Sequence, residues 1–469
     1  MIRASFARHM LAVFVAFVSV TCVVPVSAAA PWAVHGDIVT ERGSRKGTVV
    51  FDDSGILGVM YDDTAGERTT VSADARQVEH GGYIFPGLID CHNHAQWNAI
   101  PSWRSDRKYR DRYEWQNDRA YEKKVKQPYY AQIERNNLSY AALKYAEIRA
   151  VVGGTTALQS SYPVDVPPLL VRNLDSEYQT DSKVTSILQT TPEERFRFRL
   201  GLASGKIRRI FLHVAEGRRD DLESRSEFGS LTNQGWLRPG IVVIHGTALS
   251  GDEFQQMPKN GVGLVWSPRS NLVLYGETTN IADAIDQEVI VALAPDWSIT
   301  GSNNALEEMK FAHAYSKARL PPQRRLSAQR LFKMVTVDAA KVAGLEERLG
   351  AIRHGNAADL VLAPKLHGDP FESLLLTFPR HIQLVFIDGV PVYGDVEQLL
   401  KFGRSNGEVD EILVEGVPKG ICLVGDPKVA WHATQHYNEV RKILESALDG
   451  KLAPLIEDHS ADDRVLDEN

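Results

Sequence analysis

Short apolar runs separated by turn residues mark two distant parts of this chain. Between residues 34 and 83 they alternate with glycine and aspartate, and similar runs return between residues 349 and 393. This pattern is typical of short β-strands joined by tight turns. We therefore expect residues 31–83 and 346–397 to close on each other as one small β-sandwich domain.

The middle of the chain has a different pattern, in which apolar strands alternate with helical segments. Ile241–Ile244 is strand-like and is followed by a helical pattern at Asp252–Met257, and Val289–Leu293 is followed by one at Leu306–Ala318. Alternation of this kind predicts a parallel sheet made of βα units. Seven or eight units over roughly 260 residues favour a closed barrel over an open sheet. The predicted fold class is therefore α/β, with a (β/α)8 TIM-type barrel over residues 84–345.

Two terminal segments fall outside these predicted domains. Residues 1–28 carry Arg3 and Arg8, then an apolar run and small residues, which is the layout of a secretory signal peptide. The run is shorter than the roughly 20 residues of a membrane-spanning helix. We therefore expect a periplasmic or secreted protein without stable membrane insertion after cleavage. Residues 398–469 are expected to form a C-terminal extension, loop-rich to about Trp431 and then helical.

The composition restricts the kinds of molecule that this protein is expected to bind. The 469 residues include 53 Lys and Arg against 60 Asp and Glu, for a formal net charge of −7. No excess of cations is available for phosphates, so nucleic acid is not an expected partner, and a small molecule is. The glycine pairs lack phosphate-loop spacing, so no organic cofactor site is predicted. Three cysteines are too few for a disulfide framework, so ordinary burial must stabilise the core.

The sharpest chemical signal follows the apolar strand at Leu88–Ile89. Asp90 and Cys91 lead into His92 and, two positions later, His94. Residues two apart on a strand point to the same face, so the two imidazoles lie side by side. A pair of this kind at the end of a barrel strand can chelate one divalent metal ion.

Three further apolar strands end in a potential metal ligand. These ligands are His213, His245 and Asp296, and Glu216 follows His213 by three positions. With His92, the spacings place the candidates on strands 1, 5, 6 and 8 of the predicted barrel. Because barrel active sites are built at the C-terminal ends of the strands, we predict a metal site there.

Five motifs in this order resemble the metal-dependent amidohydrolase superfamily. They are PGLIDCHNHA, LHVAEG, VVIHGTALS, SPRSNLVLYGE and ALAPDWS. Within that superfamily the resemblance is to the cytosine deaminase-like and chlorotriazine hydrolase-like branch, and it covers roughly residues 34–395. It implies four metal ligands: His92, His94, His213 and Asp296. Dimers are common in that family, so a homodimer is a further expectation.

The implied chemistry is hydrolysis by a metal-activated water. Three imidazoles and a carboxylate leave a coordination position for water, whose pKa the metal lowers. The resemblance gives Glu216 the role of proton shuttle, His245 that of polarising the attacked group, and Asp296 that of orienting the water. Lys183 lies at the wrong end of its strand to bridge two metals, which favours one ion. Zinc suits these ligands best, and Fe²⁺ or Mn²⁺ would also fit.

The predicted function is therefore exported hydrolysis of non-peptide C–N bonds, as deamination of a cyclic amidine or nitrogen heterocycle. Two alternatives stay open at this point. One is ring opening of a cyclic amide, as in imidazolonepropionase-like relatives, and the other is a catalytically silent binding protein on the same fold.

An aromatic-rich segment, residues 97–130, follows the first barrel strand directly. It is interpreted either as a partial lid whose rings stack on a flat substrate or as helix packing or an oligomer contact. Five residues are predicted to line the substrate pocket: Trp97, Trp103, Arg269, Asn271 and Trp297.

Overall fold

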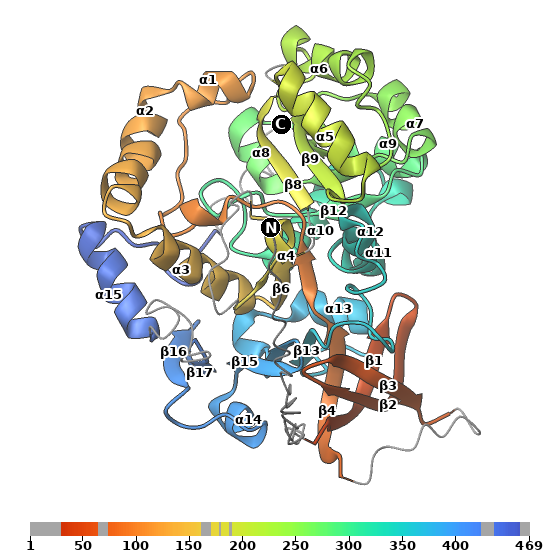
Figure 1. Ribbon diagram of the computed structural model, residues 1–469, viewed down its shortest axis with the longest axis vertical. Coiled ribbons are helices and arrows are strands. Elements are labelled where there is room, and N and C mark those ends of the chain that lie inside the picture. The colour runs from red at the N-terminus through yellow and green to blue at the C-terminus, as the bar shows by residue number, and fades with distance from the viewer. Residues whose placement is uncertain are drawn as a thin grey trace, which may run out of the picture.

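The structure is a computed structural model that describes residues 30–63, 74–160, 170–177, 180–186, 190–423 and 436–459 (Figure 1). For residues 176–177 and 180–186 it describes the backbone alone. The predicted signal peptide, residues 1–28, lies outside the described residues. Within them, no helix is both long and apolar enough to cross a membrane.

Eight strands of the middle region pair in parallel, in sheets of three and five strands. They are β5 (Leu88–Asp90), β6 (Thr155–Leu158), β7 (Arg172–Asn173), β8 (Thr180–Ser186), β9 (Arg209–Val214), β10 (Ile241–His245), β11 (Gly263–Trp266) and β12 (Val291–Leu293). A parallel bridge between Asn93 and Asp296 links the ends of β5 and β12. Among the described residues no ladder joins β7 to β8. The α/β class is confirmed, and the closed barrel stays a prediction.

Helices lie between these strands in sequence, as the alternating pattern predicted, except between β6 and β7, where none falls within the described residues (Figure 1). They are α3 (Ser139–Val151), α4 (Leu174–Glu177), α5 (Pro192–Ala203), α6 (Leu222–Asn233), α7 (Gly251–Lys259), α8 (Pro268–Tyr275), α9 (Ile281–Asp286), α10 (Ala305–Arg319), α11 (Ala328–Met334) and α12 (Val337–Ala343). One apolar cluster takes a residue from each of five parallel strands: Ile89, Phe211, Val242, Val265 and Ala292. These buried side chains hold together the strands that carry the candidate ligands.

The two chain ends meet in one nine-stranded sheet below the parallel strands in Figure 1. Its order is β16 (Asp410–Val414), β17 (Val417–Ile421), β15 (Val390–Gly394), β14 (Leu384–Ile387), β13 (Leu360–Ala363), β4 (Arg76–Pro86), β1 (Trp32–Thr40), β2 (Gly43–Asp52) and β3 (Gly55–Tyr61). The joint is the antiparallel pair of β4 and β13, in which Phe85 lies opposite Val361. The strands of the expected sandwich thus form one continuous hydrogen-bonded sheet.

Two sequence expectations for this region are wrong. The stretch before Trp431 is not loop-rich throughout, because β16 and β17 form a hairpin that pairs with β15. A two-residue turn joins them, with Glu415 and Gly416 both at positive φ. The apolar run at Leu349–Ile352 forms no strand. Helices α13 (Pro370–Leu376), α14 (Val396–Lys401) and α15 (Tyr437–Ala447) complete this end of the chain.

Beyond α15, residues 451–459 pack against α3. The hub of this contact is Arg149, which is fully buried. Its guanidinium donates to Leu455 O over 3.3 Å, to Asn98 O over 2.5 Å and to Ser298 Oγ over 2.6 Å. It also donates to the Asn303 side chain. The C-terminal end is therefore bonded to the loops that follow β5 and β12.

Candidate metal centre and cavity

Four parallel strands bring five candidate ligands to one end of the sheets. His92 and His94 follow β5, His213 lies in β9, His245 is the last residue of β10, and Asp296 follows β12. Backbone pairing fixes the first and last of these segments, because the His94 N–H donates to the Asp296 carbonyl over 2.7 Å. Side chains from separate strand ends thus converge on one place.

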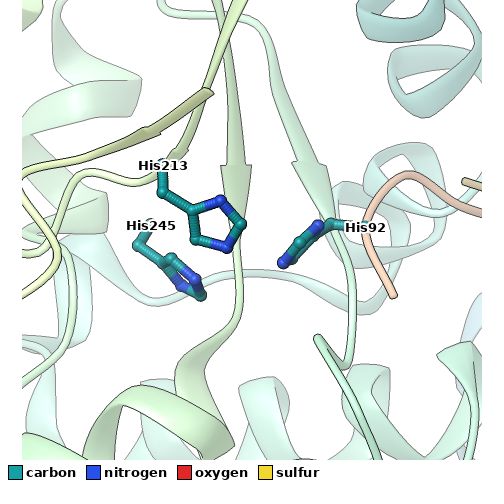
Figure 2. A group of neighbouring side chains, drawn as sticks. All are labelled: His92, His213 and His245. Carbon is teal, nitrogen blue, oxygen red and sulfur yellow. The ribbon is translucent and has the colours of Figure 1, made fainter. Parts of the chain in front are cut away.

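The imidazole rings pack closely around His92. Ring-centroid distances from His92 are 4.9 Å to His94, 4.8 Å to His213 and 5.5 Å to His245. Figure 2 shows the rings of His92, His213 and His245 facing one small region. Asp296 belongs to the same cluster, since its Oδ1 lies 3.1 Å from His92 Nε2 and 3.4 Å from His94 Nε2.

This donor set fits a divalent metal ion. Ligand atoms of His92, His213 and His245 lie within 4.8 Å of one another, and so do those of His92, His94 and Asp296. The two groups share His92. Neutral imidazoles and a carboxylate are the ligands that zinc and similar ions prefer.

The protonation states suit metal binding as well. Burial lowers the pKa of His94 to about 3, and it holds the pKa of His213 well below its ordinary value. Both rings are therefore neutral at pH 7, the form that binds metal ions. Burial alone would raise the pKa of Asp296, but its contact with His92 and the neighbouring imidazoles lower it, so this side chain is a carboxylate.

The backbone is strained at two of the candidate residues. His245 has φ 68° and Asp296 has φ 71°, in the left-handed region that side chains other than glycine rarely adopt. Strain of this kind costs on the order of 1–3 kcal/mol and persists where the surroundings impose it, often at functional sites. The Thr279 hydroxyl, for example, donates to the His245 carbonyl over 2.5 Å.

Helix α8 supports the cluster from behind. The Ser270 hydroxyl donates to Asp296 Oδ2 over 2.7 Å, which fixes the carboxylate. The Asn271 amide oxygen accepts from Thr278, so its NH₂ group points at His245 Nδ1, 3.0 Å away. A His245 ring that accepts at Nδ1 carries its proton on Nε2. That atom is buried, without a hydrogen-bond partner among the described residues, and is thus a proton donor toward the centre.

Glu216 lies beside this cluster on the segment after β9. Its Oε2 is 3.8 Å from His245 Nε2 and 3.3 Å from the Arg112 guanidinium, while the Tyr275 hydroxyl donates to its Oε1 over 2.6 Å. Burial raises the pKa of the Glu216 carboxyl, and Arg112 is the main group that opposes this rise. A raised pKa makes this carboxyl a better proton acceptor than an exposed glutamate.

A cavity of about 210 Å³ opens above the cluster. Its polar floor contains His94, His213, His245, Glu216 and Asp296. Its walls are mainly aromatic, formed by Trp97, Trp115, Tyr121, Tyr130 and Trp297, and Arg112, Gln116 and Lys126 complete the lining. Four of these five rings come from the segment 97–130, which folds over the site as η1 (Ala95–Trp97), α1 (Arg112–Gln116), α2 (Arg119–Tyr121), η2 (Glu122–Lys126) and η3 (Tyr129–Glu134). Ring packing around Trp297, such as Trp115 at 5.7 Å between centroids, holds the walls together.

Three residues predicted for the pocket do not line this cavity. Trp103 is buried against Tyr121, behind the wall. Arg269 points the other way from its helix, toward Glu307 at 3.6 Å, and lines a separate cavity. Asn271 is fully buried behind His245, as a support for the ring. The predicted pocket residues that do line the cavity are Trp97 and Trp297.

Sequence reasoning missed the polar and aromatic partners of Glu216. Arg112 and Trp115 lie among many charged and aromatic neighbours in the 97–130 segment, which hides them. Tyr275 lies inside the quoted motif SPRSNLVLYGE, four positions after Asn271. Because residues four apart share a helix face, a site role for Asn271 could have pointed to Tyr275.

Comparison with known proteins agrees with this picture. A sequence model described as the amidohydrolase family matches residues 83–392, which is more than half of the chain. A 5′-deoxyadenosine deaminase of Methanobrevibacter smithii is 31% identical over 159 residues, which are 33% of this chain and 37% of the relative. A 5′-deoxyadenosine deaminase of Methanosarcina mazei is 22% identical over 363 residues, 68% of this chain and 79% of the relative.

Solved structures show the same fold. A zinc-bound adenosine deaminase from Xanthomonas campestris superposes with a TM-score of 0.62 at 15% identity, over 79% of this chain and 96% of that one. A guanine deaminase from Bradyrhizobium japonicum gives 0.60 at 18% identity, over 78% and 100%. A triazine hydrolase variant gives 0.61 at 16% identity, over 79% and 98%.

Proposed function

The chain belongs to the amidohydrolase family, and we propose that it deaminates a flat nitrogen heterocycle by hydrolysis at a single metal centre. As a member of this family it is an enzyme that acts on C–N bonds other than peptide bonds. The observation that carries the proposal is the place of Glu216. Its carboxylate lies between the histidine cluster and the aromatic cavity, where a proton shuttle for deamination has to be.

We propose that His92, His94, His213 and Asp296 hold one metal ion and that this ion is zinc. When bound, such an ion lowers the pKa of a water molecule toward neutrality and polarises the bond under attack. His245 is left to donate its Nε2 proton to the attacked group, since Asn271 occupies its Nδ1.

Glu216 moves the protons of the reaction. Its carboxylate takes one from the attacking water and gives it to the ring nitrogen next to the attacked carbon. A second proton passes to the exocyclic amine, the C–N bond breaks, and ammonia leaves. The oxygen of the water stays on the carbon as a carbonyl group.

The cavity walls support a flat substrate. Indole and phenol rings on several sides, with a free volume of about 210 Å³, suit a one- or two-ring heterocycle that stacks between them. Relatives with aligned sequence include deaminases of 5′-deoxyadenosine and of 5-methylthioadenosine/S-adenosylhomocysteine. Deamination is therefore favoured over ring opening of a cyclic amide.

Ammonia release from a substrate panel tests the proposal. Purines, pyrimidines, pterins, triazines, hydantoins and 5′-deoxyadenosine are incubated with the zinc-loaded protein, alongside the variants Glu216→Gln and Glu223→Gln. We expect ammonia from at least one amino-substituted ring, a fall in kcat of about 10²- to 10⁴-fold in Glu216→Gln, and no change in Glu223→Gln, whose side chain is exposed. Hydrolysis of hydantoins alone, or an active Glu216→Gln protein, would contradict it.

Two further proposals concern the whole chain. We propose that residues 1–28 direct export, since they have the layout of a signal peptide. N-terminal sequencing of protein from the periplasm or medium checks this, and a mature start after position 28 is expected. We also propose that the eight parallel strands close as one barrel, which the bridge between Asn93 and Asp296 supports.

A further inference from the structure

A hydrogen-bonded chain runs from the aromatic wall to Glu216. The Trp115 indole N–H donates to the Tyr275 hydroxyl over 2.8 Å, and the Tyr275 hydroxyl donates to Glu216 Oε1 over 2.6 Å. The direction of this chain is fixed, because an indole nitrogen only donates. The phenol oxygen must accept from Trp115, which leaves its single proton for the carboxylate.

A second contact holds the other carboxylate oxygen. Arg112 is one turn away from Trp115 on α1, and its guanidinium lies 3.3 Å from Glu216 Oε2. The Arg112 backbone N–H also donates to the Glu216 carbonyl over 3.2 Å, and Asp111 bridges to Gly217. Helix α1 thus contacts the Glu216 backbone and Oε2 directly, and it reaches Oε1 through Tyr275 of α8.

The segment before α1 is fastened to the helix that carries Tyr275. The Lys108 ammonium donates to Leu272 O over 3.0 Å, and the Tyr109 N–H donates to Leu274 O over 2.7 Å. These carbonyls belong to the last turn of α8. Movement of α1 away from the cavity would therefore pull on the hydrogen bonds that end at Glu216.

Trp115 connects the hydrogen-bonded chain to Glu216 with the cavity. Its ring lines the cavity and packs on Tyr121 at 5.0 Å and on Trp297 at 5.7 Å between centroids. A flat ring that stacks in the cavity presses on the same side chain whose indole N–H starts the chain to Glu216.

We propose that Trp115, Tyr275 and Arg112 are positioning residues that link the aromatic wall of the cavity to the orientation of the Glu216 carboxylate. The inference deepens the proposed function and rests on the shuttle role given there to Glu216. It follows that binding of a flat substrate is coupled to the orientation of the Glu216 carboxylate for proton transfer. Loss of Tyr275 acts on turnover, while loss of Trp115 acts on both binding and turnover.

The hydrogen-bonded chain from Trp115 to Glu216 is tested first, without any substrate. Full-length protein labelled with ¹⁵N at tryptophan gives one indole N–H signal per tryptophan, and Trp115→Phe identifies the signal of Trp115. We expect Tyr275→Phe to shift this signal, because the acceptor is gone, and Glu216→Gln to shift it too, because the phenol loses its charged partner. The control Tyr393→Phe removes another buried, hydrogen-bonded hydroxyl in the nine-stranded sheet and leaves the signal in place. A Trp115 signal whose chemical shift stays the same in Tyr275→Phe or in Glu216→Gln would overturn the proposal.

Kinetics test the consequence, with a substrate from the ammonia panel. A hydrogen bond to a charged group contributes about 1.5–3 kcal/mol, so Tyr275→Phe should lower kcat about 10- to 100-fold with KM nearly unchanged. Trp115→Phe should lower kcat and raise KM, whereas the buried control Trp236→Phe should change neither. Unchanged kcat in Tyr275→Phe would overturn the positioning role. If no compound releases ammonia, the proposed function fails, while the indole signals still decide whether Trp115 is linked to Glu216 through Tyr275.

Discussion

Replacement of Arg149 by methionine probes how the C-terminal end holds the site together. Methionine keeps an unbranched apolar stem, but it is shorter and removes every donor from a group that is fully buried. Four acceptors lose a hydrogen bond, namely Asn98 O, Ser298 Oγ, Asn303 Oδ1 and Leu455 O, and of these Asn303 Oδ1 keeps one from the Glu457 N–H. At about 1 kcal/mol for each acceptor, the free energy of unfolding falls by about 4 kcal/mol, within the range known for breaking buried charged contacts.

This loss converts into a measurable change of Tm. Unfolding entropies are about 2.1 cal/mol/K per residue, so a chain of 469 residues has about 1 kcal/mol/K, and Tm should fall by about 4 °C. Thermal unfolding followed by circular dichroism measures it. The matched control is Arg441→Met on α15, whose exposed pair with Glu445 contributes about 0.5 kcal/mol or less. A Tm for Arg149→Met within 1 °C of the control would refute the account of this hub.

Three further outcomes are expected. Ser270→Ala, which removes the hydrogen bond to Asp296, should weaken zinc binding about 10- to 100-fold in competition with a chelator, whereas Ser373→Ala in α13 should not. The pKa of Glu457 is lowered to about 2, so its carboxylate stabilises the fold fully above the ordinary carboxyl pKa. This stabilisation is lost as the pH falls toward 2. The variant Glu457→Gln should therefore flatten the decline of Tm between about pH 5 and pH 2. Trp97→Leu, which removes one cavity wall, should raise KM about 2- to 10-fold with kcat unchanged.

The ligand cluster could be predicted because strand geometry and motif spacing agree on it. His92 and His94 share a face of one strand end, and the structure brings both to His213 and Asp296. Strand-end spacing predicted a metal site here, because the main chain fixes the direction of a side chain at the end of an apolar strand, whereas the set of four ligands was implied by the family resemblance.

Side chains on loops and helices could not be placed in this way. Arg269 and Ser270 are neighbours at the start of α8, yet one faces Glu307 and the other Asp296. Their directions depend on where the helix starts, and a shift of one residue turns a side chain by about 100°. The hairpin of β16 and β17 was missed although its turn residue Gly416 was a visible signal, because its strands are short and partly charged.

The pairing of β4 with β13 has a consequence for biosynthesis. Phe85 can pair with Val361 only after the ribosome has made the whole parallel region between them. Its translation takes roughly 15 to 55 seconds at ordinary rates. Until then the β4 edge is unpaired, in addition to the permanent edge at β3, and the N-terminal strands lack part of their core. Contacts this distant in sequence also form slowly. A nascent chain that folds late stays unfolded longer, which would suit passage through a secretion channel if the export that we propose for this chain takes place.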